Sequence, residues 1–139
     1  MQFKSLFLAL ATLYAMVAAS MVTVSYDHTY DNASRNLSMT ACSDGPHGLE
    51  SKFPTFGSLR HFPNIGGAVA IAFWDSPSCG SCWRLTYENR SINVLAVDHA
   101  ADGFNIAFAA MNKLTNGQAR SLGRVNATAK EVSASACGL

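Results

Sequence analysis

Four cysteines constrain the fold of this chain more than any other feature of its sequence. Cys42, Cys79, Cys82 and Cys137 all follow residues 1–19, which have the layout of an export signal. Cysteines pair stably in oxidising compartments such as the extracellular space, and small exported domains use disulfides to supplement a limited core. We therefore expect a secreted chain with a signal peptide at 1–19 and one disulfide-tied domain at 20–139.

The N-terminal segment is typical of a cleavable signal and not of a membrane anchor. Lys4 supplies a positive charge, residues 7–16 form an apolar run, and small residues at 17–19 supply a cleavage site. The apolar run is shorter than the roughly 20 residues that span a bilayer, so we expect no membrane anchor. Export also makes the Asn-x-Ser/Thr triplets candidate glycan acceptors. These triplets begin at Asn32, Asn36, Asn89 and Asn126.

The charge of the mature chain argues against a nucleic-acid partner. Loss of Lys4 with the signal leaves nine basic and nine acidic residues, and the two signs are interspersed. A protein that binds nucleic acid electrostatically would show a basic stripe. The sequence also contains no repeat, low-complexity segment or linker, which favours a single domain.

Three pairings of the four cysteines are open, and the sequence alone does not choose among them. A Cys79–Cys82 pair would form a small loop of the redox-active type, but the strand and helix context of such sites is missing. We favour two long links, because each would constrain the unfolded chain by about 3 to 4 kcal/mol in the loop-entropy model. We expect no metal or cofactor, since no histidine lies at a zinc-ligand spacing from the cysteines. The histidines are His28, His47, His61 and His99.

Hydrophobic patterns predict several short strands. Apolar and polar residues alternate at 22–26 and again at 125–130, which is typical of half-buried strands. A nearly all-apolar run at 68–73 suits a buried strand, and residues 83–87 and 92–97 are expected to form a hairpin. The chain is therefore predicted to be mainly β.

The remaining segments are predicted to be helices, turns and one polar stretch. A helix of about three turns is expected from Asn105, whose amide would cap the first turn, followed by a short helix at 118–122. Residues 27–41 are expected to be a mobile polar segment, and the Gly- and Pro-rich residues 42–67 to form turns and short helical pieces. Short strands with one small helix favour a closed barrel over a layered parallel sheet.

Six motifs, in order along the chain, resemble the cerato-platanins, which are small secreted proteins of filamentous fungi. The motifs are Val24-Ser25-Tyr26-Asp27, Cys42-Ser43-Asp44-Gly45, Phe53-Pro54-Thr55-Phe56-Gly57, Phe62-Pro63-Asn64-Ile65-Gly66-Gly67, Trp74-Asp75-Ser76-Pro77-Ser78-Cys79-Gly80-Ser81-Cys82-Trp83 and Gly103-Phe104-Asn105-Ile106. Together they span essentially the whole mature chain, and six motifs in order are highly specific.

The resemblance implies a fold and a set of functions. The fold would be a six-stranded double-psi β-barrel with short helices, similar to the first domain of expansins and to family 45 endoglucanases. Its disulfides would be Cys42–Cys79 and Cys82–Cys137. The implied functions are binding of chitin oligomers, residence in the fungal cell wall, hydrophobin-like surface activity and elicitation of plant defence. Expansin-like loosening of cellulose without hydrolysis is a further implied activity.

Glycoside hydrolysis normally needs two carboxyl groups, and the resemblance implies that one is lost. An acidic residue opens the short helix in the barrel relatives, whereas the matching residue here is Asn105, whose amide cannot donate a proton to a leaving group. Asp98 resembles the other acidic residue of the expansin groove. Asp75, Asp44 or Asp102 would replace the missing acid only by lying within about 10 Å of Asp98. We therefore expect a protein that is not an enzyme, with weak endoglucanase activity as an alternative.

The predicted carbohydrate site consists of Asp98, Asn105 and Tyr26, with Asp75 as a secondary candidate. The tyrosine offers a hydroxyl and a ring face for a pyranose. Each residue also has an ordinary structural interpretation. Asp98 would accept backbone N–H groups, Asn105 would cap a helix, Tyr26 would pack over the core, and Asp75 would form a turn.

Two tryptophans and one histidine near these residues are expected to be structural. Trp74 and Trp83 flank the cysteine cluster, so we expect them in the core and not as a sugar platform. His99 follows Asp98, but neighbours on an extended strand face opposite ways, which argues against a catalytic pair.

The sequence therefore predicts a secreted, non-catalytic protein that binds chitin oligomers or another cell-wall polysaccharide and elicits plant defence, with a plant receptor as a further partner. An expansin-like protein and a surface-active cell-wall protein are the alternatives. We expect an extracellular or cell-wall location and a monomer or weak self-association.

Overall fold

The computed structural model describes residues 10–13 and 18–139. Most of the predicted signal peptide lies outside the described residues, so cleavage after residue 19 stays a prediction. In chain order the elements are β1 (Ser20–Tyr26), η1 (His28–Asp31), η2 (Leu37–Met39), η3 (Phe56–Ser58), β2 (Ile65–Ala68), β3 (Cys82–Tyr87), β4 (Arg90–His99), β5 (Phe104–Ile106), α1 (Phe108–Leu114), α2 (Ala119–Leu122), β6 (Arg124–Val132) and η4 (Ala134–Cys137), where η marks a 3-10 helix.

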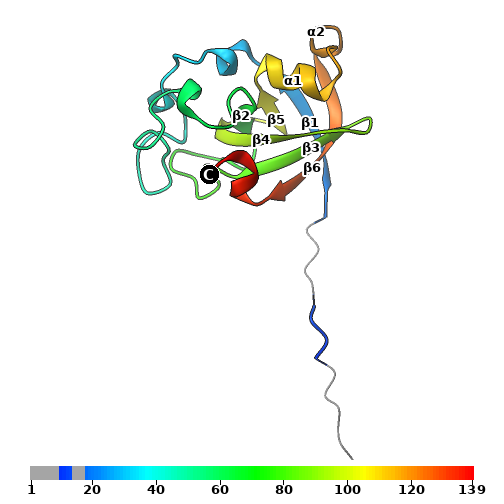
Figure 1. Cartoon of the computed structure of the whole chain (residues 1–139), viewed down its shortest axis with the longest axis horizontal. Coiled ribbons are helices and arrows are strands. Elements are labelled where there is room, and N and C mark those ends of the chain that lie inside the picture. Colours follow the sequence, from blue (N-terminus) through cyan, green and yellow to red (C-terminus); the bar gives the residue numbers. More distant parts are fainter. Residues whose placement is uncertain (1–9, 14–17) are drawn as a thin grey trace, which may run out of the picture.

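Six strands close into a barrel with both parallel and antiparallel neighbours (Figure 1). Around the barrel the order is β1-β5-β2-β4-β3-β6. Strand β1 runs parallel to β5 and β2 runs parallel to β4, whereas the other neighbours are antiparallel. Closure pairs every one of these strands on both sides, which removes exposed sheet edges. The predicted six-stranded barrel is confirmed.

Four strands lie where the sequence patterns placed them, but β2 and β5 do not. The predicted hairpin is confirmed as β3 and β4, and the predicted first and last strands as β1 and β6. The buried strand predicted at 68–73 is wrong, because β2 ends at Ala68 and the chain turns from Val69 onward. Two glycines in β2, Gly66 and Gly67, hide this strand from an apolar pattern since they carry no side chain.

The barrel interior is filled by apolar side chains that alternate along the strands. They include Val24, Ile65, Leu85, Leu95, Phe104, Ile106 and Val125, none more than 7% exposed. Alternation places every second side chain inside and leaves the intervening polar residues on the outer face. Asn105 of β5, between the buried Phe104 and Ile106, is one of these outer residues, whereas Tyr26 at the end of β1 is on the same side as Val24 and packs partly against the core.

Helix α1 lies across one end of the barrel (Figure 1) and is capped by a residue distant in sequence. Met111 of α1 is fully buried. The Asp31 carboxylate accepts hydrogen bonds from the backbone N–H groups of Phe108 and Ala109, at 2.8 and 2.9 Å. Such N–H groups have no partner within the helix. The predicted cap at Asn105 is wrong, because Asn105 lies in β5 and the helix begins three residues later.

The chain between β1 and β2 forms a layer without strands, which we call the irregular layer (residues 27–64). A mobile polar segment at 27–41 is the wrong description, since η1 and η2 place Tyr30 and Leu37 in the core. The turns and short helical pieces predicted at 42–67 are confirmed, although β2 begins within that range.

Two disulfides attach the irregular layer and the C-terminal segment to the barrel. Cys42 in the irregular layer is bonded to Cys79 in the loop between β2 and β3, 37 residues away. Cys82 at the start of β3 is bonded to Cys137 in η4, 55 residues away. The pairing that the resemblance implied is confirmed, and the redox-type pair of Cys79 with Cys82 is excluded.

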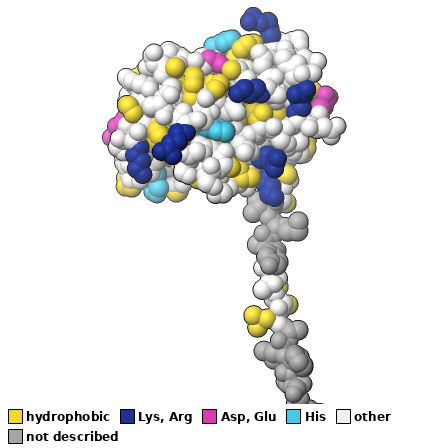
Figure 2. Space-filling view, in the orientation of Figure 1, with side chains coloured by type: hydrophobic (Ala, Val, Ile, Leu, Met, Phe, Trp, Pro, Cys, Tyr) yellow, Lys and Arg dark blue, Asp and Glu magenta, His cyan; other side chains and the backbone are white. Residues whose placement is uncertain are grey.

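Charged side chains are scattered over the visible surface. Figure 2 shows Lys and Arg side chains spread over one face among hydrophobic and uncharged ones, without a continuous basic stripe on that face. This face therefore lacks the concentrated positive field that attracts nucleic acid. In the described part of the chain, no helix has the length and apolar character needed to cross a membrane.

Candidate functional site

A row of paired residues crosses four strands at one level of the barrel. Ser25 in β1 pairs with Asn105 in β5, Asn105 pairs with Gly67 in β2, and Gly67 pairs with Asp98 in β4. The two neighbours of Asn105 in β5 are buried in the barrel, so Asn105 faces outward. The register therefore brings Asn105 and Asp98 to the two sides of Gly67.

An open groove of about 470 Å³ lies beside this row. It is lined by Ser25, Tyr26, His99, Ala100, Ala101, Asp102, Asn105 and Arg124. These residues come from β1, from β5, from the end of β4 with the loop that follows, and from the start of β6. Two of the predicted site residues, Tyr26 and Asn105, thus line one groove, whereas Asp98 and Asp75 are not among its lining residues.

The Asn105 side chain is held by β1 and keeps one group free. Its amide oxygen accepts a hydrogen bond from the Ser25 hydroxyl at 3.0 Å. Its amide nitrogen donates to no residue that the structure describes. Because the residue is only half-buried, that nitrogen remains a donor for a ligand in the groove.

The Asp98 carboxylate is occupied by donors from the irregular layer and from its own strand. One carboxylate oxygen accepts the backbone N–H groups of Ala41 at 2.9 Å and His99 at 2.8 Å. The other oxygen accepts the Tyr30 hydroxyl at 3.3 Å. The structural interpretation of Asp98, as an acceptor for nearby backbone N–H groups, is confirmed.

Tyr30 reaches Asp98 because a glycine leaves room beside it. A Cβ atom at Gly67 would lie 3.2 Å from the Tyr30 hydroxyl oxygen and 2.7 Å from the His99 carbonyl oxygen. Burial and the neighbouring Asp98 charge raise the pKa of Tyr30 far above its usual value of 10.0. The hydroxyl therefore stays protonated over the physiological range and serves as a donor to Asp98.

Tyr26 combines packing with exposure. Its ring meets the Phe108 ring edge-on with centroids 5.0 Å apart, and it meets the His28 ring in the same manner at 5.6 Å. The Arg120 guanidinium lies over the Phe108 ring, 5.6 Å from its centroid. Such packing fixes the ring, and the part of Tyr26 that remains accessible borders the groove.

Three further polar residues of the groove were not predicted as site residues. The Arg124 guanidinium donates to the Thr23 hydroxyl at 2.8 Å, and that hydroxyl lies 3.4 Å from the Asp102 carboxylate, to which it donates. The His99 Nδ1 donates to the Ile71 carbonyl at 2.6 Å, which leaves Nε2 as the acceptor of the neutral ring. Arg124, Asp102 and His99 all lie at or beyond strand ends. No local motif marks them, and only the order of the strands in the barrel brings them together.

Asp75 lies away from the groove and stabilises a turn. Its φ is 57°, its backbone N–H donates to the Ala41 carbonyl at 2.9 Å, and its carboxylate accepts the backbone N–H of His47 at 2.7 Å. The interpretation of Asp75 as a turn former is confirmed. Asp75 is not among the residues that line the groove.

The two tryptophans have different environments. Trp83 is half-buried and packs edge-on against Phe104 of the core at 5.5 Å. Trp74 is 56% exposed, so its predicted position in the core is wrong. Its indole N–H donates to the Asp44 carboxylate at 2.8 Å, which holds the ring at the surface.

The four candidate glycan acceptors all lie on the surface. Asn32 and Asn36 belong to the irregular layer, Asn89 to the turn between β3 and β4, and Asn126 to the outer face of β6. All four side chains are exposed. Glycosylation at these positions stays a prediction.

The groove offers polar contacts on an open surface. Donors come from Asn105 and Arg124, an acceptor from Asp102, and a hydroxyl and ring edge from Tyr26. Among its described lining residues there is one carboxyl group, Asp102, whereas hydrolysis of a glycosidic bond normally uses two across the sugar. The arrangement suits the binding of a hydroxyl-rich ligand.

The sequence is similar to several proteins of fungi. A family model described as Cerato-platanin matches residues 22–139. Allergen Asp f 15 of Aspergillus fumigatus is 53% identical over 116 residues, which cover 84% of this chain and 76% of the relative. The heat-stable 19 kDa antigen of Coccidioides posadasii is 45% identical over 122 residues, which cover 87% of this chain and 84% of the relative.

Solved structures share the barrel. The crystal structure of cerato-platanin 2 from M. perniciosa matches with a TM-score of 0.84 and 46% identity, covering 86% of this chain and 100% of that one. The solution structure of the fungal elicitor cerato-platanin matches with a TM-score of 0.74 and 42% identity, covering 84% of this chain and 96% of that one. Sequence, disulfides and barrel agree, and the chain belongs to the cerato-platanin family.

Proposed function

We propose that this protein binds chitin oligomers or a related β-linked cell-wall polysaccharide in the groove beside β1 and β5, without cleaving the ligand. The observation that carries the proposal is that Tyr26 and Asn105 line one open polar groove. Membership of the cerato-platanin family supports the same ligand class.

The groove chemistry matches a chain of sugar rings. Sugar hydroxyls and N-acetyl groups both donate and accept hydrogen bonds, and the groove presents Asn105, Arg124 and Asp102 for them. The ring of Tyr26 supplies an apolar edge for the C–H face of a pyranose. Each polar contact replaces a contact with water, so the net gain is small and the dissociation constant falls in the millimolar to micromolar range.

Binding without cleavage is favoured by the residues at the two positions where a hydrolase of this fold would carry its carboxyl groups, Asn105 and Asp98. Asn105 stands where the resemblance implies a proton donor, and an amide does not supply one. Asp98 accepts three hydrogen bonds, which hold it as a structural group beneath the irregular layer. We place Asp98 as a positioning residue and assign direct ligand contact to Tyr26 and Asn105.

Titration of chitohexaose by calorimetry tests the groove. Tyr26→Ala and Asn105→Ala are each expected to weaken binding about tenfold, which corresponds to about 1.4 kcal/mol. Tyr87→Ala is the matched control, because Tyr87 is also half-buried but lies at the end of β3 outside the groove. Absence of saturable binding, or unchanged affinity in both groove variants, contradicts the site. Release of reducing ends from the hexamer contradicts the non-catalytic part.

We also propose that the protein is secreted, with residues 1–19 removed and residues 20–139 forming the mature domain. Two disulfides and the signal-like N-terminus support export. Intact-mass analysis of protein from culture medium is expected to show an N-terminus near residue 20, with a mass decrease on enzymatic removal of N-glycans if the exposed sequons are used. Retention of the protein inside the cell contradicts this proposal.

A second candidate function is activity at surfaces, and an exposed apolar loop favours it. Val69, Phe73 and Trp74, between β2 and β3, are 48%, 62% and 56% exposed. Large exposed apolar groups near one another often mark an interaction surface. Pendant-drop tensiometry is expected to show a fall in surface tension that Phe73→Ser reduces and Asn105→Ala does not. An unchanged surface tension in wild-type protein rejects this function.

Elicitation of plant defence is a further proposal, supported by family membership and by the relative whose structure is described as that of a fungal elicitor. Infiltration of purified protein into leaves tests it, with reduced and alkylated protein as the control. A defence response to the folded protein alone is expected. No response, or an equal response to the unfolded control, contradicts recognition of the fold.

A further inference from the structure

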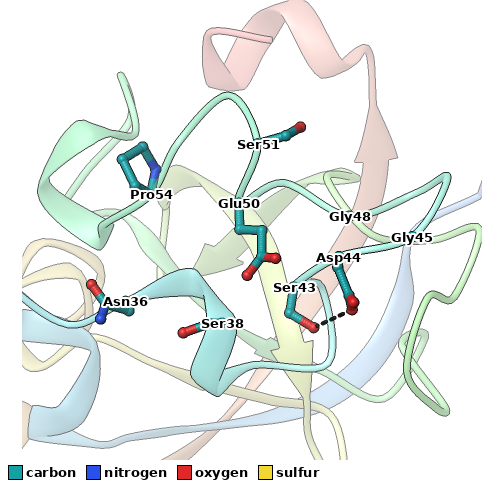
Figure 3. Close-up of a pocket in the computed structure, with 9 residues that line it drawn as sticks. All are labelled: Asn36, Ser38, Ser43, Asp44, Gly45, Gly48, Glu50, Ser51 and Pro54. Atoms are coloured by element: carbon teal, nitrogen blue, oxygen red, sulfur yellow. Dashed lines mark hydrogen bonds between the residues drawn. The ribbon is translucent and has the colours of Figure 1, made fainter.

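A second cavity, of about 490 Å³, lies in the irregular layer and shares no lining residue with the groove. Figure 3 shows its lining residues, with the Glu50 side chain pointing into the cavity toward Ser43 and Asp44. The lining consists of Asn36, Ser38, Ser43, Asp44, Gly45, Gly48, Glu50, Ser51 and Pro54. We call this cavity the layer pocket.

The lining selects against anionic ligands. It supplies serine hydroxyls, one amide and the two carboxylates of Asp44 and Glu50, and it includes no Lys or Arg. An anion would meet uncompensated negative charge there. A neutral ligand rich in hydroxyl groups can donate hydrogen bonds to both carboxylates and exchange them with the serines.

An exposed aromatic ring borders the layer pocket through a shared residue. The indole N–H of Trp74 donates to the Asp44 carboxylate at 2.8 Å, and Asp44 also lines the pocket. This bond satisfies the single polar atom of the indole and fixes the ring, while more than half of the side chain stays accessible. A fixed, exposed aromatic face next to hydrogen-bonding groups is the combination that binds the apolar face of a sugar ring.

Asp44 keeps one oxygen free for a ligand. Its Oδ1 accepts the Trp74 indole at 2.8 Å and the Ser43 hydroxyl at 3.2 Å, whereas Oδ2 accepts from no residue that the structure describes. The bond from Trp74, and then that from Ser43, lower the pKa of Asp44. The Asp44 carboxyl therefore stays ionised, and remains an acceptor, to lower pH than it would without these two bonds.

We propose that Trp74 and the layer pocket form a second saccharide site, which binds a neutral β-linked hexopyranose oligomer. One ring stacks on the Trp74 indole, and hydroxyls of the adjoining ring donate to Asp44 and Glu50. The site uses no groove residue, so it stands or fails separately from the function proposed above.

Fluorescence tests the site directly, because the chain has two tryptophans. The Trp83→Phe variant leaves Trp74 as the only indole. Titration with cellohexaose or chitohexaose is expected to give a saturable change in its emission, and hexagalacturonate, an anionic hexamer, is expected to give none. In the same background Asp44→Asn and Glu50→Gln are each expected to weaken the response at least threefold. Asn105→Ala, in the groove, is expected to leave it unchanged.

Two results overturn the proposal. One is the absence of a saturable Trp74 response to either neutral hexamer, and the other is loss of the response in Asn105→Ala, which would assign the signal to the groove. If Trp83→Phe does not fold, the two indole N–H signals in the NMR spectrum of wild-type protein replace fluorescence. A shift of the Trp74 signal on titration supports the site, and an unmoved signal at saturating hexamer rejects it.

Discussion

The barrel and the irregular layer of this protein are stabilised in different ways. Each barrel strand bonds two neighbours, and alternate side chains fill a continuous apolar core. The irregular layer buries side chains such as Tyr30 and Leu37, but it has no strand ladder, and its attachments to the rest of the molecule include the Cys42–Cys79 disulfide, the hydrogen bonds of Asp98 and the capping of α1 by Asp31. We therefore expect the loss of one contact to reduce the local stability of the irregular layer more than that of the barrel.

The same difference separates the two candidate binding sites. The groove lies on the barrel, where the strand register fixes Tyr26 and Asn105. The layer pocket and Trp74 lie in segments without strands, held by Asp44 and the neighbouring turns. Variants that loosen the layer are thus expected to spare the groove, and the following experiments use this expectation.

Removing the disulfides should have the largest effect. The double variant Cys42→Ser/Cys79→Ser is expected to lose about 4 kcal/mol of unfolding free energy in the loop-entropy model, and so is Cys82→Ser/Cys137→Ser. The two should differ in hydrogen exchange. In Cys42→Ser/Cys79→Ser, amide exchange is expected to become faster in the irregular layer and to stay unchanged in β3 and β4, since the pairing of the barrel strands does not depend on the Cys42–Cys79 disulfide. Equal acceleration throughout the barrel in the first variant would contradict the comparison.

Asp98→Ala should have the next largest effect. It leaves the N–H groups of Ala41 and His99 and the Tyr30 hydroxyl without their acceptor, at an expected loss of about 2 kcal/mol. Asp98→Asn retains an acceptor oxygen and should lose less. Urea denaturation of wild type and both variants measures the differences in unfolding free energy. Equal unfolding free energies for wild type and Asp98→Ala would show that these hydrogen bonds do not stabilise the fold.

A smaller loss is expected at the cap of α1. Asp31→Ala removes the acceptor for the N–H groups of Phe108 and Ala109, and loss of a cap costs about 1 kcal/mol. Asp31→Asn keeps an oxygen and serves as the matched variant. Faster exchange of these two amides, with β3 unchanged, is the expected result, and unchanged exchange would exclude Asp31 as the cap.

The smallest effect at neutral pH is expected for Tyr30→Phe, because Asp98 keeps its two backbone donors. The effect should appear in alkali. The folded protein raises the pKa of Tyr30 above its usual value of 10.0, so the resulting stability is present below pH 10 and is lost as the pH rises above it. Tyr30→Phe should therefore lose stability less steeply than wild type above pH 10. Parallel slopes would contradict the buried environment of this hydroxyl.

The barrel could largely be predicted from the sequence, whereas the attachments of the irregular layer could not. Local patterns predicted the first and last strands and the hairpin, because each of these patterns lies within one short segment of the chain. The acceptor for Phe108 lies 77 residues away at Asp31, and the partner that holds Trp74 at the surface lies 30 residues away at Asp44. No local pattern indicates either contact. The helix cap was therefore assigned to Asn105 and not to Asp31, and Trp74 was placed in the core and not at the surface.

The candidate site shows the same division. Tyr26 and Asn105 were identified through motifs of the family, and the register explains why they meet. Arg124 and His99 come from β6 and β4, and only the order of strands in the closed barrel brings them to the groove. Asp98 was identified as a polar residue of interest, but its hydrogen bonds to the layer depend on a tertiary contact with Ala41.

The most direct test of the groove is an NMR titration of the isotope-labelled mature protein with chitohexaose, followed by analysis of the recovered oligomer. Saturable shifts are expected at Ser25, Tyr26, Asn105 and residues 99–102, with the hexamer recovered intact. Saturation without shifts at these positions, or recovery of shorter oligomers, would contradict it.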